Sequence, residues 1–323
     1  MIKQELINIL KEYNLGKVKE VNPVPTSGNI SFLIKADSGK YIFRVCPDGL
    51  RWRSRKEISA ELELIDYLNK HNFPALYPIA KRNNDIIIEY KNKFGYLRKY
   101  NSGKAILNPN VKQITEFGKT LGWLHSLVDN YQTKNKREHI WDLKTTQENF
   151  LEVKDFILKS NFPKADVFII KFEKEIFDLF FPKELPQGMI HEDLGKRHVL
   201  WQDNKVSGIL DFDRCYYGKL VLDLGQAIRG WCFINNWQKW NNENFESLIN
   251  GYSQKRKLTD KELKYLFSAV KFGVLERGLS FCLRFIKTSQ SQNDQKFAHQ
   301  SVFELIDLLD KNKKEFKKVL EQV

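Results

Sequence analysis

The first hundred residues alternate apolar and polar positions in short runs that are typical of β-strands. The segments ISFLIKAD (30–37) and KYIFRV (40–45) are joined by the turn signal DSGK, which predicts an antiparallel hairpin. A helix is predicted over 54–73, where Ile58, Leu62, Ile65 and Leu68 recur at helical spacing before Pro74. The segments DIIIEY (85–90) and FGYLRKY (94–100) predict a second hairpin. The order β, β, α, β, β describes a small lobe.

From Pro109 onward the pattern changes to long helices. One apolar stripe runs through residues 110–127, and similar stripes continue from Leu248 to the C-terminus. Only HVLWQ (198–202) and VSGILDF (206–212), turned by DNK, interrupt the helices with another predicted hairpin. We therefore expect an α+β fold with two lobes: a small antiparallel-sheet lobe with one helix at 1–100, and a larger, mostly helical lobe at 101–323.

Composition narrows the class of protein. The chain has 323 residues, 42% of them hydrophobic, which is enough for a large core. The net charge of +13 comes from lysines spread along the chain, so a nucleic-acid partner is not indicated, whereas a basic field favours anionic ligands such as nucleotides. The four cysteines match no metal-ligand spacing, and no apolar run approaches the ~20 residues of a membrane span. We expect a cytoplasmic protein with no membrane partner.

The stretch GMIHEDLGKRHVLWQDNKVSGILDFDRC (188–215) carries the candidate chemistry. Its H-E-D-L and D-F-D motifs keep the spacing of the kinase signature H-R-D-L-x-x-x-N followed by D-F-G. Phosphoryl transfer needs one carboxylate to deprotonate the attacking hydroxyl and another to hold Mg²⁺. The spacing places Asp193 in the first role and Asp211 in the second. His198 replaces the asparagine that would be the second metal ligand, and Asp213 replaces the glycine.

The first lobe offers supporting residues. In the turn PTSGNISF, Gly28 and Asn29 stand where a phosphate-covering loop would lie, although an ordinary hairpin turn would look alike. Arg44 of YIFRV is a candidate cation for the phosphates, with Glu61 of the following helix as its ion-pair partner. An ordinary surface pair is the alternative for these two residues.

Taken with these motifs, the chain resembles the aminoglycoside phosphotransferase and choline kinase superfamily, and within it the type II homoserine kinases. The resemblance runs from SGNISFLI through ELELIDYLNKHNFPALYPI and FGKTLGWLHSL to the catalytic stretch. It continues in LVLDLGQAIRGWCF and in the segment from LINGYSQ to FCLRF. The resemblance implies a protein-kinase-like fold and an ATP-dependent, Mg²⁺-requiring kinase, with GTP as the alternative nucleotide.

The resemblance also implies which residues bind the nucleotide, the metal and the acceptor. The resemblance implies Asp193 as base, Asp211 and His198 as metal ligands, Arg44 at the phosphates, Tyr100 at the hinge, and His191 and Asp223 as supports of the catalytic loop. Magnesium prefers oxygen ligands, so His198 is the unusual member.

The acceptor is expected to be a small-molecule hydroxyl, homoserine first. Its carboxylate would need a cation from Arg229, Arg277 or Arg284, and Trp231 could wall the pocket. The alternatives are an aminoglycoside or macrolide antibiotic, choline held by a cage of Trp231, Trp237 and Trp240, and a kinase-fold binding protein without turnover. A protein kinase is disfavoured, because few residues separate Asp211 from the helix near Asp223 and no A-P-E follows. The oligomeric state is left open.

Overall fold

The computed structural model describes residues 3–25, 29–46, 54–90, 93–129, 131–133, 135, 137 and 141–322. The chain divides into two compact units. Unit 1 contains residues 1–105, 132–137 and 198–215, and unit 2 contains residues 106–131, 138–197 and 216–323. The second half of the predicted catalytic stretch therefore belongs to unit 1. The assignment of nucleotide binding to residues 1–100 and of catalysis to residues 101–323 stays a prediction.

Unit 1 is built on a five-stranded sheet in the order β1-β2-β3-β5-β4. Its strands are β1 (Val18–Val24), β2 (Ile30–Ala36), β3 (Gly39–Val45), β4 (Ile88–Tyr90) and β5 (Lys93–Lys99). Both predicted hairpins are confirmed, since β2 pairs with β3 and β4 with β5 in antiparallel register. The predicted helix is α2 (Arg55–Lys70), which begins after Ser54 because that side chain accepts a hydrogen bond from the N–H of Glu57.

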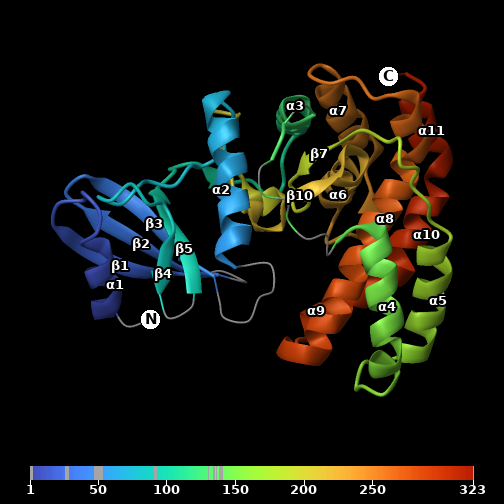
Figure 1. The fold of residues 1–323 in the computed structure, drawn as a ribbon. Coiled ribbons are helices and arrows are strands. Elements are labelled where there is room, and N and C mark those ends of the chain that lie inside the picture. The colour runs from blue at the N-terminus through green and yellow to red at the C-terminus, as the bar shows by residue number, and fades with distance from the viewer. Residues whose placement is uncertain are drawn as a thin grey trace. The chain divides into compact units, whose positions relative to one another are not determined.

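The apolar pattern did not predict helix α1 (Lys3–Leu10) or strand β1 of unit 1. Helix α1 packs Leu6 and Leu10 into a core shared with Ile34 and Phe43 of the sheet, and it is the dark blue helix of Figure 1. Strand β1 buries only Val21 and contains Pro23, as an edge strand can. Such a strand has no clear apolar alternation, so it could not be recognised from the pattern.

A second, smaller sheet of unit 1 carries the end of the catalytic stretch. Strands β6 (Lys104–Ala105), β8 (Val199–Gln202) and β9 (Lys205–Ile209) pair in the order β6-β8-β9. Asp203 and Asn204 both have positive φ, which suits the tight turn between β8 and β9. The predicted hairpin at 198–212 is thereby confirmed, and Asp211 lies two residues after the end of β9.

Unit 2 is mostly helical. Its helices are α3 (Val111–Val128), α4 (Leu143–Leu158), α5 (Ala165–Phe177), α6 (Leu220–Cys232), α7 (Asn242–Ser253), α8 (Asp260–Arg284), α9 (Gln292–His299), α10 (Ile306–Lys311) and α11 (Lys313–Leu320). Two antiparallel strand pairs complete it: β7 (Gln187–Ile190) with β10 (Tyr216–Lys219), and β11 (Phe233–Ile234) with β12 (Lys239–Trp240).

The long helix α8 lies within the helical unit, packed against α6, α9 and the π-helical segments Phe285–Ser289 and Gln300–Leu305 (Figure 1). Thr259 and Glu262 form a capping box at its start. Helices α3 and α7 form a second close pair. Among the described residues, no helix has the length and apolar character that crossing a membrane requires.

Candidate active site

The loop that follows β7 in unit 2 presents Asp193, and one buried carboxylate fixes its backbone. Asp223, in the first turn of α6, accepts hydrogen bonds from the N–H of His191 (2.9 Å) and from the N–H of Glu192 (2.7 Å). The N–H of Asp193 in turn donates to Nδ1 of His191 (3.2 Å). His191 and Asp223 are fully buried, whereas the Asp193 side chain is 27% exposed. Hydrogen bonds and burial therefore hold the backbone on the N-terminal side of Asp193.

Asp223 is also bonded to a chain of buried polar groups. Its Oδ2 lies 3.1 Å from Nε2 of His125, and Nδ1 of His125 lies 2.9 Å from the hydroxyl of Tyr252. Tyr252 accepts a hydrogen bond from Arg256 (2.9 Å). Burial by itself would raise the pKa of Asp223, but the hydrogen bonds and charge of His125, together with His191, hold that pKa below its ordinary value. The carboxylate therefore stays ionised, and its oxygens remain able to accept hydrogen bonds from the N–H groups of the loop.

Asp193 is paired with a cation from α8. Nη2 of Arg277 lies 2.8 Å from Oδ1 of Asp193, and the Arg277 side chain is 12% exposed. The same guanidinium lies near the carboxylates of Glu192 and Glu276. The structure thus brings the predicted base and one predicted acceptor-binding arginine into direct contact.

A second group of charges surrounds Arg44 on β3 in unit 1. Nη2 of Arg44 pairs with Oδ1 of Asp211 and lies 3.0 Å from Oδ2 of Asp213. Burial alone would lower the pKa of Arg44, but Asp211, Tyr96, Asp213 and Glu61 raise that pKa well above its ordinary value. Arg44 is therefore a permanent positive charge beside the predicted metal ligand.

Asp211 and His198 lie close enough to share one ligand. Nε2 of His198 is 3.4 Å from Oδ2 of Asp211, and both side chains are partly exposed. Asp211 has a left-handed backbone with φ 69°, a region that disfavours residues with a β-carbon. Within the described ranges, no group of three or more Asp, Glu, His or Cys side chains forms a complete metal cluster. The carboxylate of Asp211 could suffice for Mg²⁺, which keeps several waters and takes phosphate oxygens, whereas the imidazole of His198 would be the less usual donor.

The other residues predicted for the nucleotide lie in unit 1. Asn29 lies against both Asp213 and Arg44. Glu61 is fully buried and accepts a hydrogen bond from the hydroxyl of Tyr96 (3.1 Å). Tyr100 follows β5 and is 44% exposed, as a residue that contacts a ligand can be. Gly28 lies outside the described residues.

The predicted role of Trp231 as a wall of the acceptor pocket is wrong. It is fully buried, stacks on Phe117 at 3.8 Å, and donates from its indole to the carbonyl of Leu194 (2.8 Å). It therefore has no surface to offer an acceptor and supports the catalytic loop instead. Trp240 is 5% exposed, so the aromatic cage considered for choline does not form from these side chains.

Arg229, on α6, belongs to the same cluster as Asp193. Its Nε donates to Oε1 of Gln226 (3.1 Å), and its guanidinium lies 5.3 Å from the ring centre of Trp237. Burial, followed by the nearby charge of Arg277, lowers the pKa of Arg229 to about 10. Arg284 instead pairs with Asp294.

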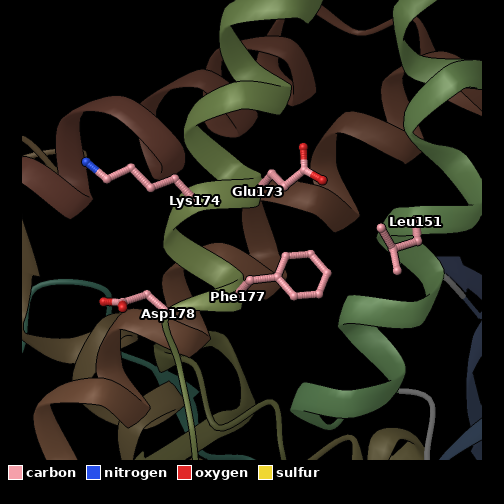
Figure 2. Close-up of a pocket in the computed structure, with 5 residues that line it drawn as sticks. All are labelled: Leu151, Glu173, Lys174, Phe177 and Asp178. Carbon is pink, nitrogen blue, oxygen red and sulfur yellow. The ribbon is translucent and has the colours of Figure 1, made fainter.

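Unit 2 also has a surface pocket that is not lined by the predicted site residues. It is lined by Leu151, Glu173, Lys174, Phe177 and Asp178 of α4, α5 and the residue after α5. Figure 2 shows Phe177 and Glu173 extending toward the helix of Leu151, with Lys174 and Asp178 pointing away. Its lining residues include none of the predicted site residues.

The sequence of the chain matches a known family over most of its length. Residues 22–256 match the model of the phosphotransferase enzyme family. The chain belongs to this family. The match confirms the family resemblance that the sequence motifs indicated. The protein is therefore a small-molecule phosphotransferase.

Curated relatives of this phosphotransferase include homoserine kinases. One, from Methylobacillus flagellatus, is 24% identical over 256 residues, which cover 78% of this chain and 76% of the relative. Another, from Phenylobacterium zucineum, is 24% identical over 261 residues, covering 80% of this chain and 78% of the relative.

Solved structures share the fold across nearly the whole chain. An amicoumacin kinase in complex with AMP-PNP, Ca²⁺ and its antibiotic has a TM-score of 0.75 at 15% identity, covering 96% of this chain and 94% of that chain. A microcompartment-associated aminopropanol kinase has a TM-score of 0.70 at 15% identity, covering 97% and 98%. These similarities confirm the predicted two-lobed, protein-kinase-like α+β fold.

Several residues that lie around the predicted site residues were not predicted from the sequence. They are Glu192, Gln226 and Glu276 around Arg277, and His125 beside Asp223. Glu192 could have been suspected, since it stands between His191 and Asp193. The others come from distant helices whose packing the sequence does not specify.

Proposed function

We propose that this phosphotransferase moves the γ-phosphoryl group of ATP to the hydroxyl of a small amino acid, homoserine first. The observation that carries the proposal is the 2.8 Å ion pair between Asp193 and Arg277, which sets a candidate base beside a candidate cation for the acceptor carboxylate. The homoserine kinases among the relatives support the choice of acceptor.

In unit 2, Asp193 would accept the proton of the acceptor hydroxyl. A base must keep its orientation as the hydroxyl attacks, and the bonds from His191 and Glu192 to Asp223 serve that purpose. Arg277 and Arg229 would bind the acceptor carboxylate, since an arginine can grip a carboxylate with two parallel hydrogen bonds.

In unit 1, Asp211 and His198 would hold Mg²⁺ and Arg44 would contact the phosphates. When bound, the metal would neutralise charge that develops on the phosphates during transfer. Arg44 would then exchange its contacts with Asp211 and Asp213 for phosphate oxygens. Gly28 and Asn29 would cover the phosphates, Glu61 would help to orient Arg44, and Tyr100 would lie against the nucleotide base. GTP is the alternative nucleotide.

A second acceptor class has a specific observation in its favour. Glu192, Asp193 and Glu276 give the cluster three carboxylates, which would attract the ammonium group of an amino alcohol. The aminopropanol kinase among the structural neighbours has the same fold. Antibiotic kinases share that fold as well, so the acceptor must be tested directly.

The test is ADP release with Mg²⁺ and either ATP or GTP over L-homoserine, 3-amino-1-propanol, choline, kanamycin and erythromycin. We expect turnover with homoserine, its loss in Asp193→Ala with nucleotide binding retained, and weakened Mg-nucleotide binding in Asp211→Ala. Asp203→Asn, in the exposed hairpin turn, is the matched control and should retain full activity. Turnover in Asp193→Ala equal to that of the unmodified enzyme would remove Asp193 from the base role. Nucleotide binding without any turnover would point to a binding protein.

A further inference from the structure

Arg277 is shared by three carboxylates, one of which is the proposed base. Its Nη2 lies 2.8 Å from Oδ1 of Asp193 and 3.4 Å from Oε2 of Glu192. Its Nε lies 3.4 Å from Oε2 of Glu276. While Arg277 neutralises Asp193, a lone pair of that carboxylate is engaged and the base is weakened for proton transfer.

Glu192 keeps Arg277 in this position through an uncommon backbone conformation. Its φ is 71°, in the left-handed region that disfavours residues with a β-carbon, and its side chain is almost fully buried. The conformation persists because the N–H of Glu192 is bonded to Asp223 and its carboxylate accepts from Nε2 of Gln226 (3.0 Å). As a result, two successive carboxylates, those of Glu192 and Asp193, reach the same guanidinium.

A second guanidinium in the cluster has an unused donor. Arg229 is 8% exposed, and its Nη1 is buried without a hydrogen-bond partner among the described residues. Its Nε is bonded to Gln226, which also bonds Glu192 and Glu276. A buried donor that lacks a partner is costly, so this atom is suited to an acceptor atom brought by a ligand.

The charges of the cluster favour a zwitterion. Glu192, Asp193 and Glu276 outnumber the guanidiniums of Arg229 and Arg277 by one. A ligand with only negative charge would increase this excess of negative charge, whereas a zwitterionic amino acid adds no net charge. The ammonium of an amino acid can approach the carboxylates while its carboxylate takes the arginine donors.

We propose that the acceptor carboxylate replaces Asp193 as the partner of Arg277 and also takes the unused donor of Arg229, so that Asp193 is released only when a carboxylate-bearing acceptor is bound. This inference rests on the proposed function. Arg277 is then a specificity-determining residue and Glu192 the positioning residue that holds it. Water and amino alcohols leave the Asp193–Arg277 pair intact and are poor acceptors.

The first experiment compares acceptors that differ by one carboxylate. For the unmodified enzyme, Arg277→Gln and Arg277→Lys, kcat/KM is measured with L-homoserine and with 3-amino-1-propanol, alongside ATP hydrolysis without acceptor. In Arg277→Gln, we expect kcat/KM for homoserine to fall at least about 100-fold, because charge-assisted bonds to the carboxylate are lost. The rate with 3-amino-1-propanol and the rate of ATP hydrolysis should rise, because Asp193 has lost its ion pair with Arg277. Arg277→Lys should keep part of the preference.

Lys271→Gln is the matched control. Lys271 lies on the same helix, its side chain is 13% exposed, and it also pairs with two carboxylates, those of Glu175 and Asp310. The Lys271→Gln variant should lose about as much stability as Arg277→Gln does, but it should keep the preference for homoserine. If Arg277→Gln lowers all three rates together, or if Lys271→Gln changes the preference equally, Arg277 has only a structural role and the inference is wrong.

Glu192 is tested by two substitutions with different backbone consequences. Glu192→Gly removes the carboxylate and suits the positive φ, so the fold should be retained. Glu192→Gln keeps the size of the side chain. Both should raise KM for homoserine more than they change kcat. Unchanged KM for homoserine in both variants would remove Glu192 from the positioning role.

A binding measurement separates this inference from the proposed function. Calorimetry with L-2-aminobutyrate, which lacks the hydroxyl, and with propylamine, which lacks the carboxylate as well, requires no turnover. We expect aminobutyrate to bind more tightly and to lose at least about tenfold in affinity in Arg277→Gln. Equal binding of the two probes would overturn the inference. If homoserine is not phosphorylated but aminobutyrate binds through Arg277, the proposed acceptor fails while the carboxylate site stands.

Discussion

Asp223 bonds two successive backbone amides and one imidazole, so a single carboxylate fixes the conformation of the catalytic loop. Asp223→Asn should lower the free energy of unfolding by about 3 kcal/mol at pH 7, because it breaks a buried, hydrogen-bonded ionic contact. Urea unfolding of both proteins measures the difference. Asp178→Asn, at an exposed carboxylate, should change stability little and serves as the control.

The pH dependence of that difference follows from the lowered pKa of Asp223. The folded state binds the proton of this carboxyl less readily than the unfolded state does. Its contribution is therefore complete above the unfolded pKa of about 3.9 and is lost as pH falls through the folded value. The stability gap between the unmodified protein and Asp223→Asn should be constant from pH 7 to 5 and shrink below pH 4. A gap that widens in acid would contradict this.

Glycines within helices of unit 2 decide how closely the helices pack. A β-carbon on Gly118 of α3 would lie 2.2 Å from the carbonyl oxygen of Leu248 on α7, whereas one on Gly230 of α6 would meet its nearest atom at 3.7 Å. Alanine favours a helix by about 1 kcal/mol over glycine. Gly230→Ala should therefore stabilise the protein by up to about 1 kcal/mol, and Gly118→Ala should destabilise it by about 2 kcal/mol through overpacking. Thermal or urea unfolding gives the sign of the stability change in each variant. A Gly118→Ala variant that is more stable than the unmodified protein would disprove the packing argument.

Elements with a long apolar run or stripe were predictable from the chain, whereas the short helix α1 and the edge strand β1 were not. Strands β2 and β3 carry apolar runs, and α2 carries a stripe at helical spacing, so their positions followed from the pattern. Strand β1 pairs with β2, the next strand along the chain, but it buries one side chain, so alternation does not reveal it. Asp193 and Asp211 were predicted from their spacing, and Arg277 and Arg44 were predicted as candidate cations. The contacts of Arg277 with Asp193 and of Arg44 with Asp211 were not predicted.

The charge of the whole chain should act on nucleotide binding. A net charge of +13 produces a field that attracts polyanions, and salt screens that field within about 10 Å at 0.1 M. We expect the dissociation constant for ATP to rise about tenfold between about 50 and 500 mM NaCl. Adenosine, which carries no phosphate, is the control and should bind equally at both concentrations. An equal effect of salt on both ligands would show that the field has no role.

The family, the fold class and the two candidate carboxylates, those of Asp193 and Asp211, could be predicted from the chain, because they depend on local periodicity and on fixed spacing. Which of the predicted residues contact one another, and which further residues join them, depends on the tertiary structure. Arg277 is 85 residues from Glu192, and His125 is 98 residues from Asp223. It also decided that Trp231 is core and that Glu192 adopts a positive φ. Such contacts depend on how helices pack, and a helical stripe shows which face is buried without showing what covers it.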